Sequence, residues 1–405
     1  MFMDNSGFVG SRLKKAREAR GMTAIQLADE IDVKRQAISN YERGKRSPAP
    51  HIKDRFCEVL GFPLSFFSVD SSEEDFQGTV FYRSMSAATK RARTRSEVEF
   101  EWLVDLVNLS ELYVEFPKVN FPKFDVPVDP TKLSVSDIEE LAEKTRRFWG
   151  LKDGPISNSV WLLENNGAVV VRRNLHADTL HAFSRWANER PYIVLSSNRD
   201  CASISRFDLA HELGHLILHR NLPEIYLRDS DYFKLIEKQA NQFSAAFQFP
   251  QAAFAKEVVR TNLEFFRILK KRWRLSIGMM LKRAKDLYFI DEKRAANLWR
   301  SYSRNGWHQR EPFDNEIPVE APKLVRNSLE IIFKSRVSGR QNILDFLNLY
   351  HLDVESCAGL PEGFLNPNAA EVHTLRPRLR EDVQPYNSDK AGKLIQFPAI
   401  DKLEN

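Results

Sequence analysis

Apolar positions recur three and four residues apart in several long stretches of the chain. Residues 96–115 and 233–247 both show this spacing, which predicts helices with one buried face. Residues 136–149 are predicted to form another helix, because Ser136 followed by Glu139 is a capping signal. Helices are therefore expected to make up most of the fold.

Two short β-branched runs interrupt this helical pattern. Residues 168–173 and 191–196 are bounded by turn residues, so we predict two strands of one sheet, and residues 76–82 could add a short strand. Residues 206–219 follow as an apolar segment without proline, which predicts a largely buried helix beside the sheet. An edge of such a sheet could hold a peptide by strand addition.

The last third of the chain has a weaker pattern. Residues 252–287 are predicted to form two helices around Trp273, and the proline-rich residues 312–322 to form a linker. A small helical region should follow. Its predicted core residues are Val325, Leu329, Ile332, Ile343, Leu344, Phe346 and Leu347. Residues after Arg376 are rich in proline and polar side chains, which predicts a loosely ordered tail.

The first 60 residues predict a compact set of short helices. Thr23 is placed to cap a helix over residues 24–31, and Asp32 and Val33 form a tight turn into a helix over residues 34–43. Two short helices joined in this way form a helix-turn-helix, whose second helix can read DNA. Arginine, asparagine and glutamine can bond bidentately to base edges. The candidate DNA-binding residues are Thr23, Gln26, Lys34, Arg35, Gln36, Ser39, Asn40 and Arg46.

This stretch resembles the XRE family of phage-repressor-type DNA-binding domains. The resemblance is carried by residues 12–17, 21–23, 26–28 and 38–48. Two positions depart from the family pattern: Ala24 replaces a glutamine that commonly supports phosphate contact, and Asp32 replaces the turn glycine. The resemblance implies a double-stranded DNA partner, and the departures imply weak binding or binding as a homodimer. A degenerate module kept for protein contacts is the alternative.

Charge and composition agree with such a module. Residues 11–60 contain 12 Lys and Arg against 7 Asp and Glu, which gives this stretch 12 − 7 = +5. A further basic cluster consists of Arg83, Lys90, Arg91, Arg93 and Arg95. Basic charge gathered at one end is typical of phosphate binding, although solvated helix surface also shows it. The 405 residues contain no apolar stretch of transmembrane length and no signal peptide, so no membrane partner is expected.

The three cysteines lie far apart and none forms a C-x-x-C pair, which argues against a disulfide scaffold and a thiolate metal site. A reducing, cytoplasmic location is therefore expected.

The segment His211-Glu212-Leu213-Gly214-His215 carries the candidate chemistry. On a helix, the two histidines leave the same face one turn apart, so both can bind one metal ion. Glu212 lies where zinc peptidases have a general base. A core helix whose histidines bond only to backbone groups is the alternative.

A catalytic zinc site needs a third protein ligand. His219 lies eight residues after His211, which is about 12 Å along a straight helix. This is too far for both to bind one metal ion, so we assign His219 an outer or packing role. The metzincin spacing would require a histidine six residues beyond His215, and the chain has none there. Glu237 is the better candidate, with Asn241 four residues on to orient a ligand histidine. A solvent-facing glutamate is the alternative.

Several spaced motifs resemble the ImmA/IrrE metallopeptidases. They lie at residues 154–156, 182–184, 206–207, 237–245, 249–250, 269–277 and 306–307, so the resemblance spans residues 145–310. Known members resemble gluzincins and cleave XRE-type repressors. The resemblance implies that His211, His215 and Glu237 bind Zn²⁺. It also implies that Glu212 deprotonates the zinc-bound water and then protonates the leaving amine. Tyr192, His181 and Tyr232 are open candidates for stabilising the oxyanion.

Together these observations predict an α+β, mostly helical fold. It consists of an all-α helix-turn-helix domain, a gluzincin-like metallopeptidase core with a small β-sheet, and a C-terminal helical region. The predicted boundaries are residues 1–68 for the helix-turn-helix domain, 69–145 for a linker and helical region, 146–310 for the peptidase, 311–375 for the small helical region and 376–405 for the tail.

The predicted function is that of a DNA-binding transcriptional regulator with a zinc-dependent endopeptidase domain, which cleaves a specific regulatory protein such as an XRE-type repressor. Two alternatives remain open at this point. One is a non-catalytic transcription factor that uses the peptidase fold as a sensor or to bind a partner. The other is an antitoxin-like partner of a neighbouring toxin.

Overall fold

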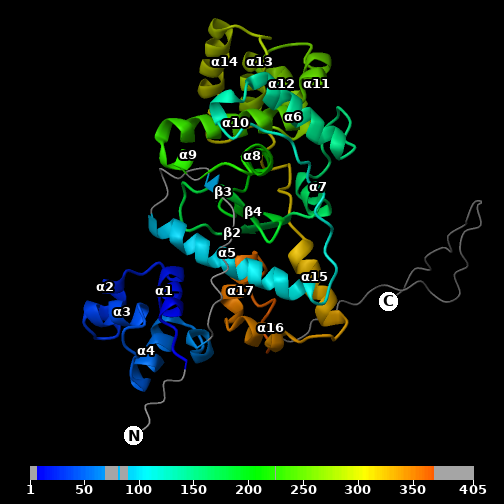
Figure 1. The fold of residues 1–405 in the computed structure, drawn as a ribbon. Helices are drawn as coiled ribbons and strands as arrows, with labels where there is room; N and C mark the ends of the chain where they lie inside the picture. Colours follow the sequence, from blue (N-terminus) through cyan, green and yellow to red (C-terminus); the bar gives the residue numbers. More distant parts are fainter. Residues whose placement is uncertain (1–6, 69–80, 83–89, 224, 369–405) are drawn as a thin grey trace, which may run out of the picture. The chain divides into compact units, whose positions relative to one another are not determined.

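The computed structural model describes residues 7–68, 81–82, 90–223 and 225–368. Residues up to Pro367 form one compact unit. Helices dominate its secondary structure and a small sheet lies among them, so the predicted α+β, mostly helical class is confirmed (Figure 1). The predicted tail and Arg83 of the basic cluster lie outside the described residues.

The N-terminal helices form the predicted helix-turn-helix. Their bounds are α1 Gly10–Ala19, α2 Ala24–Glu30, α3 Arg35–Glu42, α4 Pro50–Leu60 and the 3-10 turn η1 Leu64–Phe67. Thr23 and Gln26 form a capping box at the start of α2. Asp32 has a φ of 55°, the left-handed conformation expected at this turn. Arg17 donates two hydrogen bonds to Glu42, at 2.6 and 3.2 Å, and so ties α1 to the end of α3.

The sheet has four strands in the order β1-β3-β4-β2. Their bounds are β1 Phe81–Tyr82, β2 Val169–Arg173, β3 Ala182–Ala187 and β4 Arg190–Ser196. β2 runs parallel to β4, whereas β3 is antiparallel to both β4 and β1. The two strands predicted over residues 168–173 and 191–196 are therefore present in one sheet. β3 is an additional strand that the apolar pattern did not indicate.

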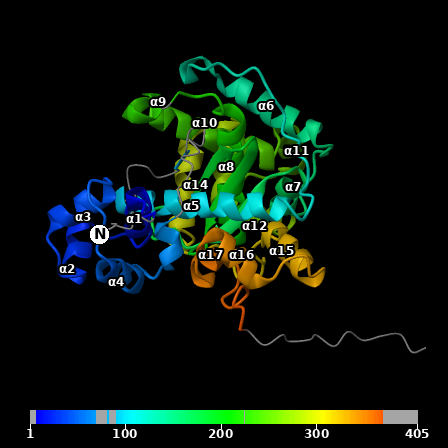
Figure 2. The ribbon, with the colours of Figure 1, turned by 60° about the horizontal axis from the view of Figure 1, so that its bottom comes forward.

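The two faces of the sheet are covered by different helices. On one side lie α6 Val135–Phe148, α8 Ala202–Leu218 and α10 Ser230–Gln248. On the other side α5 Lys90–Glu111 runs across the strands, beside helices of the C-terminal region (Figures 1 and 2). Alternate strand residues enter the two cores, because successive side chains of a strand point to opposite faces. Ile193 faces α8, whereas Tyr192 faces α5.

The cap of α6 differs from the prediction. The side chain of Ser134 accepts from the backbone N–H of Asp137, and Asp137 accepts from the backbone N–H of Ser134. The predicted pair, Ser136 and Glu139, is wrong by two residues. Both serines satisfy the same sequence signal because each has an acidic residue three positions later.

The remaining helices form two further groups. Residues 252–287 contain three helices rather than the predicted two, because Asn262 caps a new helix after a break. The first group is α11 Gln251–Glu257, α12 Leu263–Trp273, α13 Ile277–Asp286 and α14 Glu292–Arg304. The second is α15 Leu324–Lys334, α16 Arg340–Leu347 and α17 His351–Ala358. The short elements η2 Pro130–Lys132, α7 Ser159–Asn165 and α9 Ile225–Arg228 complete the described fold.

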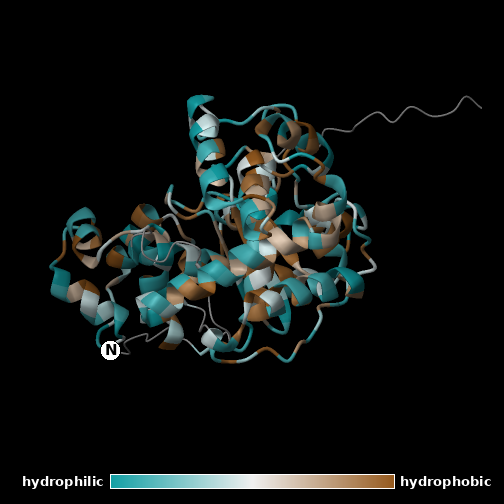
Figure 3. Cartoon of the chain, turned by 90° about the horizontal axis from the view of Figure 1, so that it is seen from above, coloured by the Kyte–Doolittle hydropathy of each residue, from teal (hydrophilic) through white to brown (hydrophobic). Residues whose placement is uncertain are grey.

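The predicted core of the C-terminal region is buried with one exception. Phe346 is 62% exposed, because its neighbours Ile343, Leu344 and Leu347 fill the buried face of α16. Hydrophilic and hydrophobic residues alternate around most helices, as expected for helices with one buried side (Figure 3). None of the described helices combines the length and apolar character needed to cross a membrane.

Candidate metal centre

The two histidines of the candidate motif lie one turn apart on α8, a helix buried along almost its whole length. His211 and His215 are both fully buried, and their Nε2 atoms lie 3.0 Å apart. Glu212, between them in sequence, is also fully buried. Buried imidazoles and carboxylates are unfavourable unless they are hydrogen-bonded or bind a metal ion, so this cluster needs specific partners.

α10 supplies a carboxylate to the same point because it packs very close to α8. A Cβ at Gly214 would lie 3.3 Å from the Cα and the carbonyl oxygen of Ala240, and also 3.3 Å from the Cβ of Phe243. The missing side chain at position 214 therefore permits the close approach of the two helices. This approach carries Glu237, one turn before Ala240, to the histidine pair.

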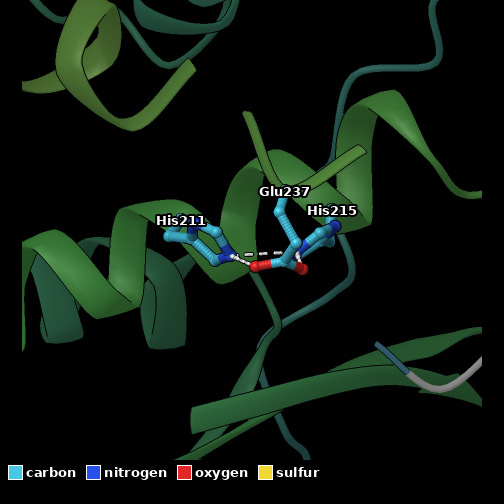
Figure 4. Close-up of side chains that lie close together, drawn as sticks. All are labelled: His211, His215 and Glu237. Atoms are coloured by element: carbon cyan, nitrogen blue, oxygen red, sulfur yellow. Dashed lines mark hydrogen bonds and ion pairs between the residues drawn. The ribbon is translucent and has the colours of Figure 1, made fainter. Parts of the chain in front are cut away.

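The three side chains converge on one small volume (Figure 4). Glu237 Oε2 lies 3.4 Å from His211 Nε2, and Glu237 Oε1 lies 3.2 Å from His215 Nε2. One ligand atom from each residue falls within 4.8 Å of the others. Two imidazole nitrogens and a carboxylate oxygen are the donor set of many catalytic zinc sites. These are the three residues that the sequence nominated.

Outer contacts set the proton positions on the first histidine. Asn241 Oδ1 lies 3.1 Å from His211 Nδ1. An amide oxygen only accepts hydrogen bonds, so Nδ1 carries the proton and Nε2 presents its lone pair to the centre. Asn241 therefore lies against the His211 ring, where it can hold the ring's orientation.

A relay of three side chains sets the second histidine. Gln239 donates its Nε2–H to the carbonyl oxygen of Pro130 at 2.7 Å, and its Oε1 lies 3.1 Å from His219 Nε2. His219 Nε2 is therefore the donor, and its Nδ1 accepts from His215 Nδ1 at 3.0 Å. As a result, His215 Nε2 also presents its lone pair to the centre. Burial is the main cause that lowers the pKa of His219 to about 3, and the electrostatic influence of His215 adds to it, so His219 stays neutral at pH 7.

The charges at the centre fit a cation. Burial raises the pKa of the Glu237 carboxyl, but its interactions with His211 and His215 outweigh this effect and bring the pKa to about 2. The carboxylate is thus ionised at neutral pH, and a metal ligand must be deprotonated to bind. Two lone pairs and a carboxylate that face one another at this distance repel unless a positive charge lies between them.

The sheet contributes a contact that the apolar pattern did not reveal. Ser184 of β3 donates its hydroxyl hydrogen to Glu212 Oε2 at 2.7 Å. Ser184 is fully buried, and it is the third residue of a strand whose position was not predicted. Its sequence signal was limited to the family motif at residues 182–184.

A cavity of about 390 Å³ lies next to the centre. Asn241 lines it together with Phe207, Met279 and Trp299, so the residue that holds His211 also forms part of the cavity wall. Charged side chains at its margin are Asp208, Lys282, Arg283 and Asp286. The cavity offers an apolar side chain a place beside the candidate metal ligands.

Of the three candidates for an oxyanion contact, Tyr192 is excluded by its position. It lies on the face of the sheet opposite α8, where its ring packs edge-on against Phe100 with centroids 5.4 Å apart. His181 Nδ1 accepts from Arg199 Nε at 3.1 Å, and the ring of Tyr232 packs against Tyr226.

The helix-turn-helix residues are distributed over the outer side of α2 and α3. Lys34, Arg35, Gln36 and Arg46 are exposed, and Ser39 and Asn40 are partly exposed. Gln36 Nε2 lies 3.4 Å from Asn40 Oδ1. The remaining two candidates, Thr23 and Gln26, are exposed but are engaged in the capping box of α2.

Comparisons with known proteins find two family models within the chain. Residues 163–285 match the IrrE N-terminal-like domain, and residues 13–67 match a helix-turn-helix model. The first match contains the whole candidate metal centre.

Similar curated proteins include two bacterial regulators and one vertebrate factor. The chain is 32% identical over 65 residues to the transcriptional regulator ClgR of Mycobacterium tuberculosis, which is 16% of this chain and 58% of that protein. It is 33% identical over 57 residues to the SPbeta prophage-derived uncharacterized HTH-type transcriptional regulator YonR of Bacillus subtilis, which is 14% of this chain and 53% of that protein. It is 36% identical over 56 residues to the endothelial differentiation-related factor 1 homolog of Xenopus laevis, which is 14% of this chain and 38% of that protein. The chain thus spans about half the length of the two bacterial regulators.

Among solved structures, a Mycobacterium tuberculosis transcriptional regulator aligns with 16% identity and a TM-score of 0.29, over 46% of this chain and 51% of that one. The two family matches agree with the two resemblances found in the sequence. The chain therefore joins an XRE-type helix-turn-helix domain to a domain of the IrrE N-terminal-like metallopeptidase family.

Proposed function

We propose that this protein is a DNA-binding transcriptional regulator with a zinc-dependent endopeptidase domain. The observation that carries the proposal is the convergence of His211, His215 and Glu237, each with the proton or charge state that a metal ligand needs. The family match over residues 163–285 supports the same chemistry.

The proposed reaction is hydrolysis of a peptide bond. When bound, zinc supplies Lewis-acid activation of water and of the scissile carbonyl. Glu212 acts as the general base that takes a proton from the attacking water and then delivers it to the leaving amine. Ser184 holds the Glu212 carboxylate through the 2.7 Å hydrogen bond, and the neighbouring cavity receives an apolar side chain of the substrate.

The proposed partners are double-stranded DNA and a protein substrate, with the protein acting in the cytoplasm. We assign DNA contact to α3 and its surroundings because Lys34, Arg35 and Gln36 are exposed on one helical turn. Thr23, Gln26, Ser39, Asn40 and Arg46 are the further proposed contacts. The proposed substrate is an XRE-type repressor or a similar regulator, because the DNA-binding domain would bring the peptidase to regulated genes. A homodimer would strengthen the DNA contact.

The test uses the purified full chain and the XRE-type repressor encoded nearest to its gene. Wild type should bind one zinc ion and cut the repressor at one site, as measured by elemental analysis and mass spectrometry. Glu212→Gln should retain zinc but lose cleavage, whereas Glu237→Gln should lose both. Cleavage by Glu212→Gln at the wild-type rate would exclude Glu212 as the base. Absence of bound zinc in wild type would refute the proposed centre.

A separate measurement tests the DNA-binding half. Fluorescence anisotropy with DNA from upstream of the gene should show weaker binding for Arg35→Ala combined with Gln36→Ala. Lys53→Ala, on α4, is the matched control and should bind as wild type does. Equal binding by all three proteins would contradict the assignment of α3.

A further inference from the structure

The outer edge of β3 is covered by a segment of the same chain. β1 pairs antiparallel with β3, with Phe81 opposite Ser184 and Tyr82 opposite Phe183. The inner edge of β3 pairs with β4 along the whole strand. β1 is therefore the terminal strand of the sheet.

This edge lies directly beside the proposed general base. The residue opposite Phe81 is Ser184, whose hydroxyl donates to Glu212 Oε2 at 2.7 Å. Adjacent strands lie about 4.8 Å apart, so the backbone of β1 passes within one strand spacing of the residue that holds Glu212. A substrate peptide whose scissile bond reaches the metal ligands and Glu212 would have to approach this same side of β3.

An extended peptide binds a sheet by pairing its backbone with the free N–H and C=O groups of an edge strand. Each edge can pair with only one further strand. β1 already pairs with the residues of β3 nearest to Glu212, so a substrate strand cannot add there while β1 is in place.

We propose that β1 is an intramolecular occupant of the peptide-binding edge, which blocks the endopeptidase until β1 leaves β3. This inference rests on the function proposed above, and its ligand class is an extended peptide segment that replaces β1. Phe81 and Tyr82 lie in the stretch between the last N-terminal turn, which ends at Phe67, and α5, which begins at Lys90. Because β1 is only two residues long, few hydrogen bonds have to break for it to leave β3. A strand from another molecule can then take its place, although β1 has the advantage of being tethered to the same chain.

A peptide-binding experiment tests the occupancy without any turnover. The parent protein is the full chain with Glu212→Gln, and the probe is a fluorescein-labelled synthetic peptide with the sequence of residues 77–86. The test variant adds Phe81→Pro and Tyr82→Pro, which remove both backbone donors of β1. The matched control adds Ala87→Pro and Ala88→Pro instead, so it has the same number of new prolines outside β1.

Freeing the edge should raise the affinity for the peptide about tenfold or more, because the tethered competitor is gone. The control should bind the peptide as weakly as the parent. Equal affinities of parent and test variant would overturn the inference, and so would an equal gain in the control. Unchanged circular dichroism would show that the prolines leave the remaining fold intact.

A second readout separates this inference from the proposed function. With Glu212 restored, the test variant should cut the nearest-encoded repressor faster than wild type, and the proline control should not. Repressor cleavage at one rate in all three proteins, with unchanged peptide affinity, would overturn the β1 inference and leave the endopeptidase intact. Absence of both zinc and cleavage in every protein would instead refute the endopeptidase, and the peptide-binding arm would still report on the edge.

Discussion

His219 illustrates how a residue outside the metal centre can determine its chemistry. It has no direct place among the three candidate ligands, yet it accepts from His215 Nδ1 and donates to Gln239 Oε1. The sequence placed His219 away from the metal by helix rise alone. Its actual role required the position of Gln239, which lies on α10 and is not visible from the spacing within α8.

We expect His219→Leu to weaken zinc binding about 10- to 100-fold, the usual effect of losing a group that orients a ligand histidine. The substitution removes the acceptor that holds His215 in the required tautomer. Competition with a chromophoric chelator measures the affinity. His308→Leu replaces an exposed histidine and should bind zinc as wild type does. A twofold change or less for His219→Leu would show that the relay has no influence on the metal.

We expect the Glu99 carboxylate to stabilise the fold at neutral pH and to lose this effect in acid. Burial raises the pKa of this carboxyl, but the charge of Arg173 and a hydrogen bond from His176 outweigh that effect and bring the pKa to about 2. Since the folded pKa lies below the ordinary value, the stabilisation is fully present above about pH 4.5 and is lost as pH falls towards 2. The difference corresponds to roughly 3 kcal/mol.

Replacing Glu99 by Gln should therefore lower the free energy of unfolding at pH 7 and flatten its decline between about pH 4.5 and 2. Urea unfolding at a series of pH values measures both effects. Glu140→Gln, which removes an exposed carboxylate of α6, is the control and should keep the wild-type slope. An unchanged slope in Glu99→Gln would contradict the low pKa of this group.

The candidate site could be predicted from sequence where its residues share one helix, but not where they come from different elements. His211 and His215 are one helical turn apart, so their proximity is a local property of α8. Glu237 was found because its spacing to Asn241 repeats a known helical arrangement. Ser184 has no such pattern, because a serine within an apolar strand resembles any other buried hydroxyl until the strand is placed beside α8.

At the level of elements, β3 was missed because neither its burial nor its turn carried the usual signals. Five of its six residues are buried, so it lacks the alternation of a half-exposed strand. Its hairpin to β4 uses Asn188 and Glu189, both with positive φ, instead of an Asn-Gly pair. The long helices were predicted more reliably because their apolar stripes repeat over several turns.

The start of α6 offers a direct comparison between two serines. Ser134→Ala removes the observed cap and should lower the free energy of unfolding by about 1 kcal/mol. Ser136→Ala, at the position first expected to be the cap, should leave stability nearly unchanged, because Ser136 lies inside the helix and is exposed. Thermal or urea unfolding of both variants shows which serine caps α6. A larger loss for Ser136→Ala would contradict the observed cap.

The contact between α8 and α10 depends on a residue without a side chain. Gly214→Ala would place a Cβ 3.3 Å from atoms of Ala240 and Phe243, so the helices must separate slightly. We expect a loss of about 1–3 kcal/mol in stability and weaker zinc binding, because Glu237 moves with α10. Gly154→Ala is the control, since a Cβ there meets nothing within 4 Å. Wild-type zinc affinity in Gly214→Ala would show that the ligand set tolerates the shift.

At the scale of the whole molecule, the apolar core of the helix-turn-helix continues into the core of α5 and the C-terminal helices. Phe62 packs edge-on against Trp102 of α5 with ring centroids 5.6 Å apart. Lys15 pairs with Glu101 at 2.8 Å, and Arg20 donates to both carboxylate oxygens of Asp353 on α17, at 2.5 and 2.9 Å. The two domains are recognisable from their sequence motifs, but these contacts join separate segments of the chain, 333 positions apart for Arg20 and Asp353, and leave no pattern in either segment.

This continuity predicts that the DNA-binding helices unfold together with α5 in wild type. Asp353→Ala removes the acceptor of a bidentate, partly buried pair, so the helix-turn-helix should open at lower free energy than the sheet. Hydrogen exchange followed by mass spectrometry should show faster exchange in α1 and unchanged exchange in β4. Asp345→Ala removes an exposed carboxylate of α16 and serves as the control. Equal protection of α1 in all three proteins would mean that the apolar contacts alone couple the DNA-binding helices to α5.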